Sequence, residues 1–148
     1  MALLHQERLI GIHPDLSSAI QIWVVFPFDV LIVQGVRSDE EQQILYAQGR
    51  TAPGNIVTKA RTAALSPHGR RRFDSGVWGC AIDAIPSIAG KALWQDIDKL
   101  ERMADAVAGV ADWGGGWQSL KDYDHFELRG WRDHDPVPDD EQPVVLEG

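Results

Sequence analysis

The chain has 148 residues, 44% of them hydrophobic, which is enough for one domain with a buried core. Its net charge of −8 and lack of a matching motif argue against nucleic-acid binding. The longest apolar run, from Trp23 to Phe28, is too short to span a bilayer, and no signal peptide is evident. A single cysteine, Cys80, excludes an internal disulfide and a cysteine-rich zinc site. We expect a monomer without stable membrane insertion.

Charge is unevenly distributed along the chain. From Asp133 onward there are six acidic residues and no lysine or arginine. We therefore predict a folded domain over residues 1–130 and an acidic, proline-containing tail over 131–148. By contrast, residues 50–73 carry six basic residues and no acidic one. Such a basic segment could face an anionic substrate or could be a solvated loop.

The first third of the chain predicts two helices around a buried strand. Pro14 suits a first helical turn, and apolar residues follow at helical spacing, which predicts a helix over 14–25. The β-branched run over 29–36 predicts a buried strand. A serine followed three positions later by glutamate then forms a capping box for a helix over 38–49. Arg37 therefore lies at a strand-to-helix junction, which would fix its side chain.

The remainder predicts a long loop, two strands and one more helix. Residues 50–76 have little periodicity, and long loops in compact domains are often functional. Apolar runs predict strands over 80–85 and 125–128, with a helix between them over 90–109. The glycine-rich stretch 113–117 predicts a turn in which backbone can pack closely. Together these elements indicate an α+β fold with helices packed on a small antiparallel sheet.

The stretch KDYDHFE, residues 121–127, concentrates side chains that can bind metal or move protons. A catalytic zinc takes three protein ligands and leaves a position for a water molecule, whose pKa it lowers to about 7. A nearby carboxylate can then accept a proton from that water. Asp122 and Asp124 both compete for this role, and a turn before His125 is needed to bring Asp122 to the same side as the histidine.

An ordered set of motifs covers most of the chain, from Ile10 to Leu128. It resembles the VanY-type zinc peptidases, which include D-alanyl-D-alanine carboxypeptidases and phage L-alanyl-D-glutamate endopeptidases, and whose fold is shared with the hedgehog signalling domain. The motifs, in chain order, are GVRSDEEQ (35–42), LYAQGRT (45–51), WGG (113–115) and DYDHFE (122–127).

This resemblance implies that one zinc ion is held by His68, Asp83 and His125. The spacing departs from the family pattern, because His68 and Asp83 are 15 positions apart instead of 7. A match without a gap would place Gly76 where a histidine belongs, so we interpret the difference as an insertion that a loop can absorb. The insertion contains three arginines, residues 70–72, and we hypothesise that it forms a flap over the site that favours an acidic peptide.

The resemblance also implies the residues that act on the substrate. Asp122 corresponds to the general base, and Arg37 to an arginine that binds substrate and steadies the oxyanion, a role that its fork of donors suits. Arg37 could alternatively form a surface salt bridge with Glu40 or Glu41. Ser66 either binds substrate or caps a turn.

The function implied is that of a zinc-dependent endolysin that hydrolyses amide bonds in peptidoglycan stem peptides. We expect an L-alanyl-D-glutamate endopeptidase that is made in the host cytoplasm and reaches the wall after the membrane is breached. The alternatives are a D-alanyl-D-alanine carboxypeptidase and a catalytically silent wall-binding domain of the same fold, whose site the insertion has spoiled.

Overall fold

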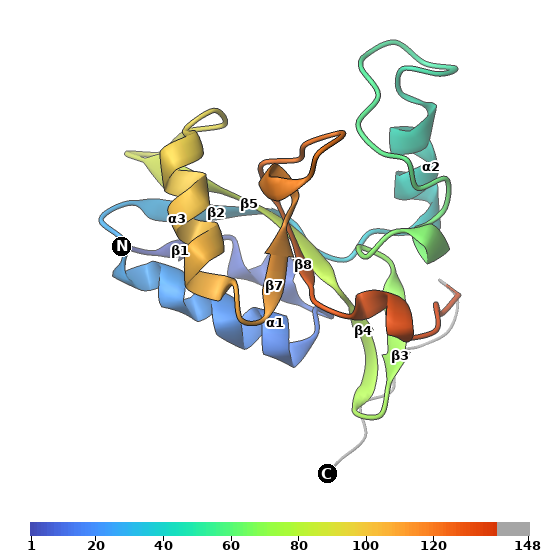
Figure 1. The fold of residues 1–148 in the computed structure, drawn as a ribbon, viewed down its shortest axis with the longest axis horizontal. Helices are drawn as coiled ribbons and strands as arrows, with labels where there is room; N and C mark the ends of the chain where they lie inside the picture. Colours follow the sequence, from blue (N-terminus) through green and yellow to red (C-terminus); the bar gives the residue numbers. More distant parts are fainter. Residues whose placement is uncertain (139–148) are drawn as a thin grey trace.

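The computed structural model describes residues 1–138, which form a mixed sheet with helices against it (Figure 1). The strand order is β1-β2-β5-β8-β7, with β6 paired to the far end of β5. All pairs are antiparallel except β1 with β2, so the predicted α+β fold with a small antiparallel sheet is confirmed. The strands are β1 (Leu3–Leu4), β2 (Asp29–Gln34), β5 (Ala81–Ile88), β6 (Lys91–Ala92), β7 (Ala111–Trp113) and β8 (His125–Leu128).

The helices lie close to the predicted positions but differ in extent. The first is α-helical over α1 (Pro14–Ala19) and continues as a 3-10 helix over Ile20–Val25. The capping box opens α2 (Asp39–Ala47) as predicted. The third, α3 (Ile97–Val107), begins seven residues later than predicted, because β6 pairs with β5 and Asp96 caps the helix. No helix within residues 1–138 has the length and apolar character needed to cross a bilayer.

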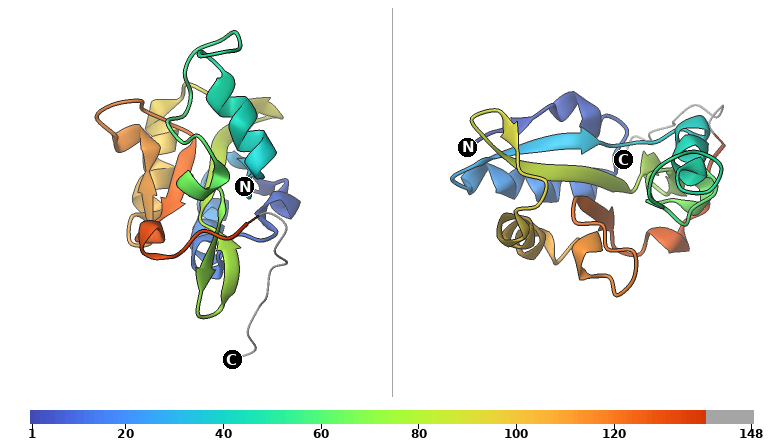
Figure 2. Two further views of the ribbon diagram at one scale, coloured as in Figure 1. Left: turned by 90° about the vertical axis from the view of Figure 1, so that its right-hand side faces the viewer. Right: turned by 90° about the horizontal axis from the view of Figure 1, so that it is seen from above.

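Strands β5 and β8 have two faces of opposite character, which we call the core face and the cleft face. On the core face, the paired residues Ile82 and Phe126 are fully buried in the main hydrophobic cluster. Trp23 packs edge-on against Phe126 at 5.0 Å and donates its indole hydrogen to the Met103 carbonyl of α3. Helices α1 and α3 therefore pack against these strands on the core face and leave the cleft face available (Figure 2).

A β-bulge in β2 changes which side chain faces the site. Ile32 pairs with Ala84 on the core face, but the next pair is Gln34 with Asp83, so Val33 is the extra residue. In a regular ladder Gln34 would follow Ile32 onto the core face, because side chains alternate. The bulge moves Gln34 to the cleft face and re-aims the chain that leads to Arg37.

The insertion between His68 and Asp83 forms a hairpin, β3 (Arg70–Phe73) and β4 (Gly76–Gly79). Its first and last residues pair, and the amide of Cys80 bonds to the carbonyl of Pro67 at 2.8 Å. An antiparallel hairpin returns the chain to its starting point, so His68 reaches β5 despite the added length. The predicted loop over 50–76 is therefore wrong for its last part.

Residues 131–138, predicted as the beginning of a loose tail, pack against this hairpin. Arg71 bridges to Pro136, and the amide of Val137 donates to the Arg70 carbonyl at 3.0 Å. Trp131 and Val137 are buried. The acidic run predicted beyond this point, from 139 to 148, lies outside the described residues.

Candidate metal centre and cleft

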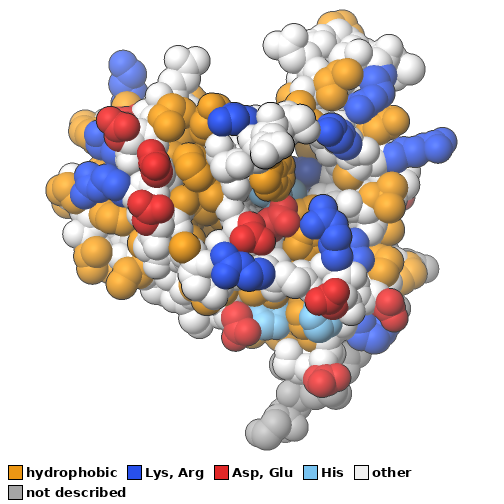
Figure 3. All heavy atoms as spheres, in the orientation of Figure 1, with side chains coloured by type: hydrophobic (Ala, Val, Ile, Leu, Met, Phe, Trp, Pro, Cys, Tyr) orange, Lys and Arg blue, Asp and Glu red, His pale blue; other side chains and the backbone are white. Residues whose placement is uncertain are grey.

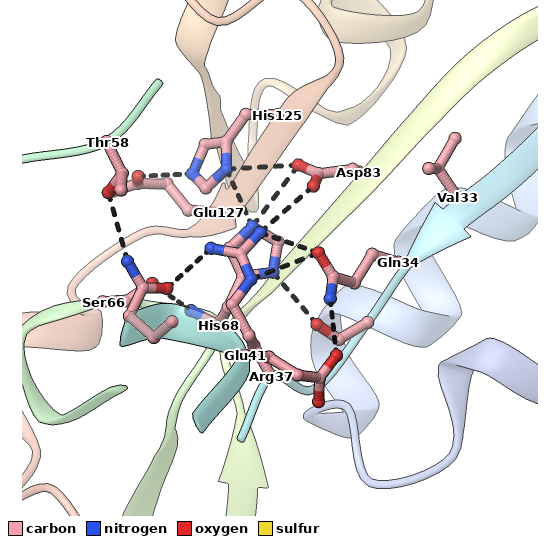
Figure 4. A network of polar contacts seen from close by, with 12 residues as sticks. Val33, Gln34, Arg37, Glu41, Thr58, Ser66, His68, Asp83, His125 and Glu127 are labelled. Atoms are coloured by element: carbon pink, nitrogen blue, oxygen red, sulfur yellow. Dashed lines mark hydrogen bonds and ion pairs between the residues drawn. The ribbon is translucent and has the colours of Figure 1, made fainter. Parts of the chain in front are cut away.

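Three side chains that can bind metal converge at the cleft face, from separate parts of the fold. Asp83 lies on β5 opposite His125 on β8, and His68 comes from the turn before the hairpin. His68 Nε2 lies 3.2 Å from His125 Nδ1 and 3.3 Å from Asp83 Oδ1, and His125 Nδ1 lies 3.5 Å from Asp83 Oδ1. The structure therefore brings together the three predicted ligands (Figure 4).

These separations fit one metal ion. Ligand atoms at about 2.0–2.1 Å from a tetrahedral ion are separated by about 3.3 Å from one another. All three side chains are buried, and Asp83 Oδ1 has no hydrogen-bond partner although it is shielded from solvent. A buried carboxylate oxygen without a partner is costly, and a cation between the three atoms would satisfy it.

The outer nitrogens of both histidines are fixed by hydrogen bonds, so their inner nitrogens are free to coordinate. The Gly35 carbonyl lies 3.0 Å from His68 Nδ1, and the Glu127 carboxylate lies 2.8 Å from His125 Nε2. Because these oxygens can only accept, each outer nitrogen donates and each inner nitrogen carries a lone pair. Such outer partners orient metal-binding histidines and raise their basicity. Glu127 therefore acts as a structural acceptor for His125.

The pKa values of the candidate ligands reflect the electrostatics of the centre. Burial lowers the pKa of His125, but the facing carboxylates of Asp83 and Glu127 outweigh it and raise this pKa to about 9. Burial likewise raises the pKa of Asp83, but the facing imidazoles of His68 and His125 bring it far below its usual range. The pocket thus favours positive charge at its centre, which is the property a metal site requires.

Arg37 is buried beside this centre and is held by a polar network. Its guanidinium donates to Gln34 Oε1 at 2.8 and 3.1 Å and to Gln42 Oε1 at 2.7 Å, and it lies 3.4 Å from Asp83 Oδ2. Gln42 is fully buried and in turn donates to Thr58 and to the Ala60 carbonyl. This geometry differs from the alternative of a surface salt bridge with Glu40 or Glu41.

Sequence reasoning missed Gln34 and Gln42. The signal for Gln42 was available, because it lies five residues after Arg37 in a helix whose N-terminus is fixed by the capping box. Gln34 could not have been found, because only the bulge turns it toward the cleft.

Asp122 and Asp124 lie at the edge of the centre, close to Asp83. The turn that the sequence required is present, since the amide of His125 bonds to the Asp122 carbonyl at 3.2 Å. Gly114 packs directly on that carbonyl, and a Cβ at this position would collide with it, as the predicted close turn requires. Burial, followed by a hydrogen bond to Asp122, raises the pKa of Asp124 to about 9.

The centre lies in an open cleft of about 680 Å³. One wall is the segment 57–60 after α2, and the other is the loop 117–120. Acidic side chains gather in the hollow between the parts that carry α3 and α2, and basic side chains lie around its rim (Figure 3). Ser66 also lines the cleft, and its hydroxyl accepts from the His68 amide, so the turn-cap alternative is observed.

The hypothesis that the insertion forms a flap over the site is wrong. No residue of the hairpin lines the cleft, and β3 and β4 extend in the direction opposite to α2 (Figure 1). Arg71 is buried against the Trp131 ring and donates to the carbonyls of His134 and Ala64. Arg70 donates to the Pro138 carbonyl. These contacts hold residues 131–138 against the hairpin, which is why the arginines do not reach the cleft.

Comparison with known proteins identifies the family of this chain. The model of the family "Phage L-alanyl-D-glutamate peptidase" matches residues 2–135. Peptidoglycan L-alanyl-D-glutamate endopeptidase CwlK of Bacillus subtilis (strain 168) is 38% identical over 110 residues, which are 68% of this chain and 60% of CwlK. The chain thus spans less than two thirds of that relative's length.

A solved structure supports the fold independently. The crystal structure of the Serratia marcescens L-Ala D-Glu endopeptidase ChiX superposes with a TM-score of 0.61 at 24% identity. The match covers 90% of this chain and 92% of that one. Fold and site together define an α+β domain with a candidate metal centre in an open cleft. By its family match, the chain belongs to the phage L-alanyl-D-glutamate peptidases, which confirms the resemblance that the motifs indicated.

Proposed function

We propose that this chain is a zinc-dependent peptidoglycan endopeptidase that hydrolyses the L-alanyl-D-glutamate bond of stem peptides. The observation that carries this proposal is the set of three buried donor atoms, 3.2 to 3.5 Å apart, at the base of an open cleft. The choice of the L-alanyl-D-glutamate bond rests on the family to which the chain belongs. The name of the relative CwlK states the same activity.

Zinc suits the donor set better than a harder ion does. Two imidazole nitrogens and one carboxylate oxygen match the ligands that catalytic zinc sites use, whereas magnesium and calcium prefer oxygen ligands. Zinc bound by His68, Asp83 and His125 would supply Lewis acidity, which acidifies a water and polarises a carbonyl. The residues around it would supply the remaining chemistry.

Asp122 is the proposed general base. Its carboxylate would take the proton from the attacking water and return it to the leaving amine. Asp124 suits this role less well, because the family resemblance places the base three residues before the third ligand histidine. Burial and a hydrogen bond to Asp122 also raise the pKa of Asp124.

Arg37 and Ser66 are the proposed substrate-binding residues. Arg37 is held by Gln34 and Gln42, so its guanidinium stays in position without reorganising when the oxyanion forms. Ser66 lines the cleft beside His68 and has a hydroxyl hydrogen available for a substrate carbonyl.

Incubation with purified peptidoglycan and mass spectrometry of the products tests this function. New glutamate N-termini that disappear when the metal is chelated are expected. Free D-alanine would indicate the carboxypeptidase alternative, and no product from several wall types would indicate a silent binding domain. The Asp122→Asn variant is expected to keep its metal and lose most activity, so full activity would reject Asp122 as the base.

The place of action follows from the substrate. We propose that the protein is made in the host cytoplasm, acts on the cell wall after the membrane is breached, and works as a monomer. Size-exclusion chromatography with light scattering, and recovery of the protein from lysates instead of virions, test these points.

A further inference from the structure

We propose that Lys59 is a specificity-determining residue that binds the free carboxylate of the glutamyl residue following the cleaved bond. The inference rests on the proposed function and extends it, because it names the substrate group that selects between chemically similar stem peptides. It is carried by the position and partners of Lys59, which no motif of the family resemblance included.

Lys59 is the one cation lining the cleft, among residues 1–138, whose charge no local carboxylate balances. The cleft also contains Arg37 and Arg132. Arg37 is directed at Asp83, and Arg132 lies over the Trp131 ring and lowers the pKa of Glu127. Lys59 forms no ion pair with any described residue and is exposed in the cleft wall.

The ammonium group reaches from one cleft wall to the other. Lys59 Nζ donates to Ser119 Oγ at 3.2 Å, and both groups are exposed. Ser119 belongs to the loop that leads to Asp122, the proposed base. A bond between an ammonium and a neutral hydroxyl in water is weak, whereas a bond to a carboxylate is charge-assisted and shorter. An entering anionic group can therefore replace Ser119 as the partner of Lys59.

The substrate bond places such an anionic group nearby. A glutamyl residue has two carboxyl groups, and only one of them continues the peptide. The other remains ionised at neutral pH and is part of the residue whose amine is released. Because Asp122 would return the proton to that amine, the glutamyl residue lies toward the wall that carries Asp122 and Ser119. Among the residues that line the cleft, Lys59 is the lysine whose ammonium group reaches this wall.

Neutral analogues of the glutamyl residue give a direct test. Two synthetic stem peptides would be compared, one with the free carboxylate and one with the isosteric carboxamide at the same position. We expect the wild-type zinc enzyme to prefer the carboxylate roughly tenfold in kcat/KM, mostly through KM, because one charge-assisted hydrogen bond is lost with the amide.

The Lys59→Met variant keeps the aliphatic stem and removes the charge. It is expected to cleave the carboxamide peptide as well as wild type does and to lose the preference for the carboxylate. Lys59→Arg is expected to retain most of the preference. The matched control is Lys121→Met, which removes a nearby exposed lysine that does not line the cleft and should leave the preference unchanged.

The outcomes separate this inference from the proposed function. If wild type cleaves both peptides equally, or if Lys59→Met keeps the preference, the role of Lys59 is rejected while the endopeptidase stands. An equal loss of preference in Lys121→Met would also reject the role of Lys59, because the preference would then depend on the total positive charge near the cleft and not on one residue. If wild type cleaves neither peptide and releases no glutamate N-termini from peptidoglycan, the proposed function itself fails.

Discussion

The two faces of β5 and β8 carry opposite chemistry on the same two strands. On the core face, Ile82 and Phe126 pack beneath Trp23 and are fully buried. One residue away along each strand, Asp83 and His125 meet on the cleft face with His68. The core face depends on apolar burial, which tolerates any group of the right shape. The cleft face depends on ligand type and position, so it tolerates almost no change.

Alternation along a strand lets one short segment serve both purposes. In β8, the order His125, Phe126, Glu127, Leu128 places two polar groups toward the cleft and two apolar groups toward the core. The rigid packing on one side holds the ligands on the other side in place. The two faces should therefore respond differently to substitution, in metal binding on one side and in folding stability on the other.

Removing a ligand should have the largest effect on the cleft face. His68→Ala is expected to abolish stoichiometric zinc binding, because two ligands cannot hold the ion. Metal content after dialysis, measured by atomic emission, checks this. His134→Ala is the matched control, since that histidine packs on Phe73 outside the cleft. Unchanged zinc in His68→Ala would remove His68 from the site and with it the interpretation of the insertion.

Removing an aromatic ring should have the largest effect on the core face. Phe126→Ala is expected to lower the free energy of unfolding by about 3–5 kcal/mol, because it leaves a cavity beside Trp23. Chemical denaturation measures this loss, with Val24→Ala as an exposed control. The folded fraction should still bind one zinc ion. A loss of zinc without a loss of stability would contradict the separation of the faces.

The outer hydrogen bond of His125 should contribute less than a ligand does. Glu127→Gln removes the carboxylate that orients His125 while conserving shape, and a decrease in zinc affinity of about 10–100-fold is expected. Competition with a chromophoric chelator measures it. Asp112→Asn, which affects an exposed ion pair with Arg129, should leave the affinity unchanged. Equal affinities in both variants would show that Glu127 has no such role.

The thiol of Cys80 should have the smallest effect of these groups on the free energy of unfolding, and this effect should appear only at alkaline pH. Burial raises the pKa of its thiol from 9.0 to about 12. Above pH 9 the unfolded chain loses this proton and the folded chain keeps it, so stability falls as pH rises. Relative to Cys80→Ala, wild type should lose about 1.4 kcal/mol more between pH 8 and 10. Parallel pH dependence of the two unfolding free energies would refute this.

Local patterns predicted most elements because their causes are local. The capping box at Ser38 and the apolar run that contains Ile32 specify α2 and β2 without distant contacts. The start of α3 was wrong, because β6 forms only through pairing with β5. The packing of residues 131–138 was not predicted for the same reason, since Trp131 is buried by contacts with distant residues, among them Arg71 of the hairpin.

The sequence by itself determined the family, the α+β class and the residue types of the metal centre. These features depend on motifs and periodicities that involve residues close together in the sequence. Only the tertiary structure decided that His68 reaches Asp83 across an inserted hairpin, that a bulge at Val33 turns Gln34 toward Arg37, and that Lys59 spans the cleft. Each of these features results from contacts between segments that are distant in the sequence. A pattern of neighbouring residues does not specify the geometry of such contacts.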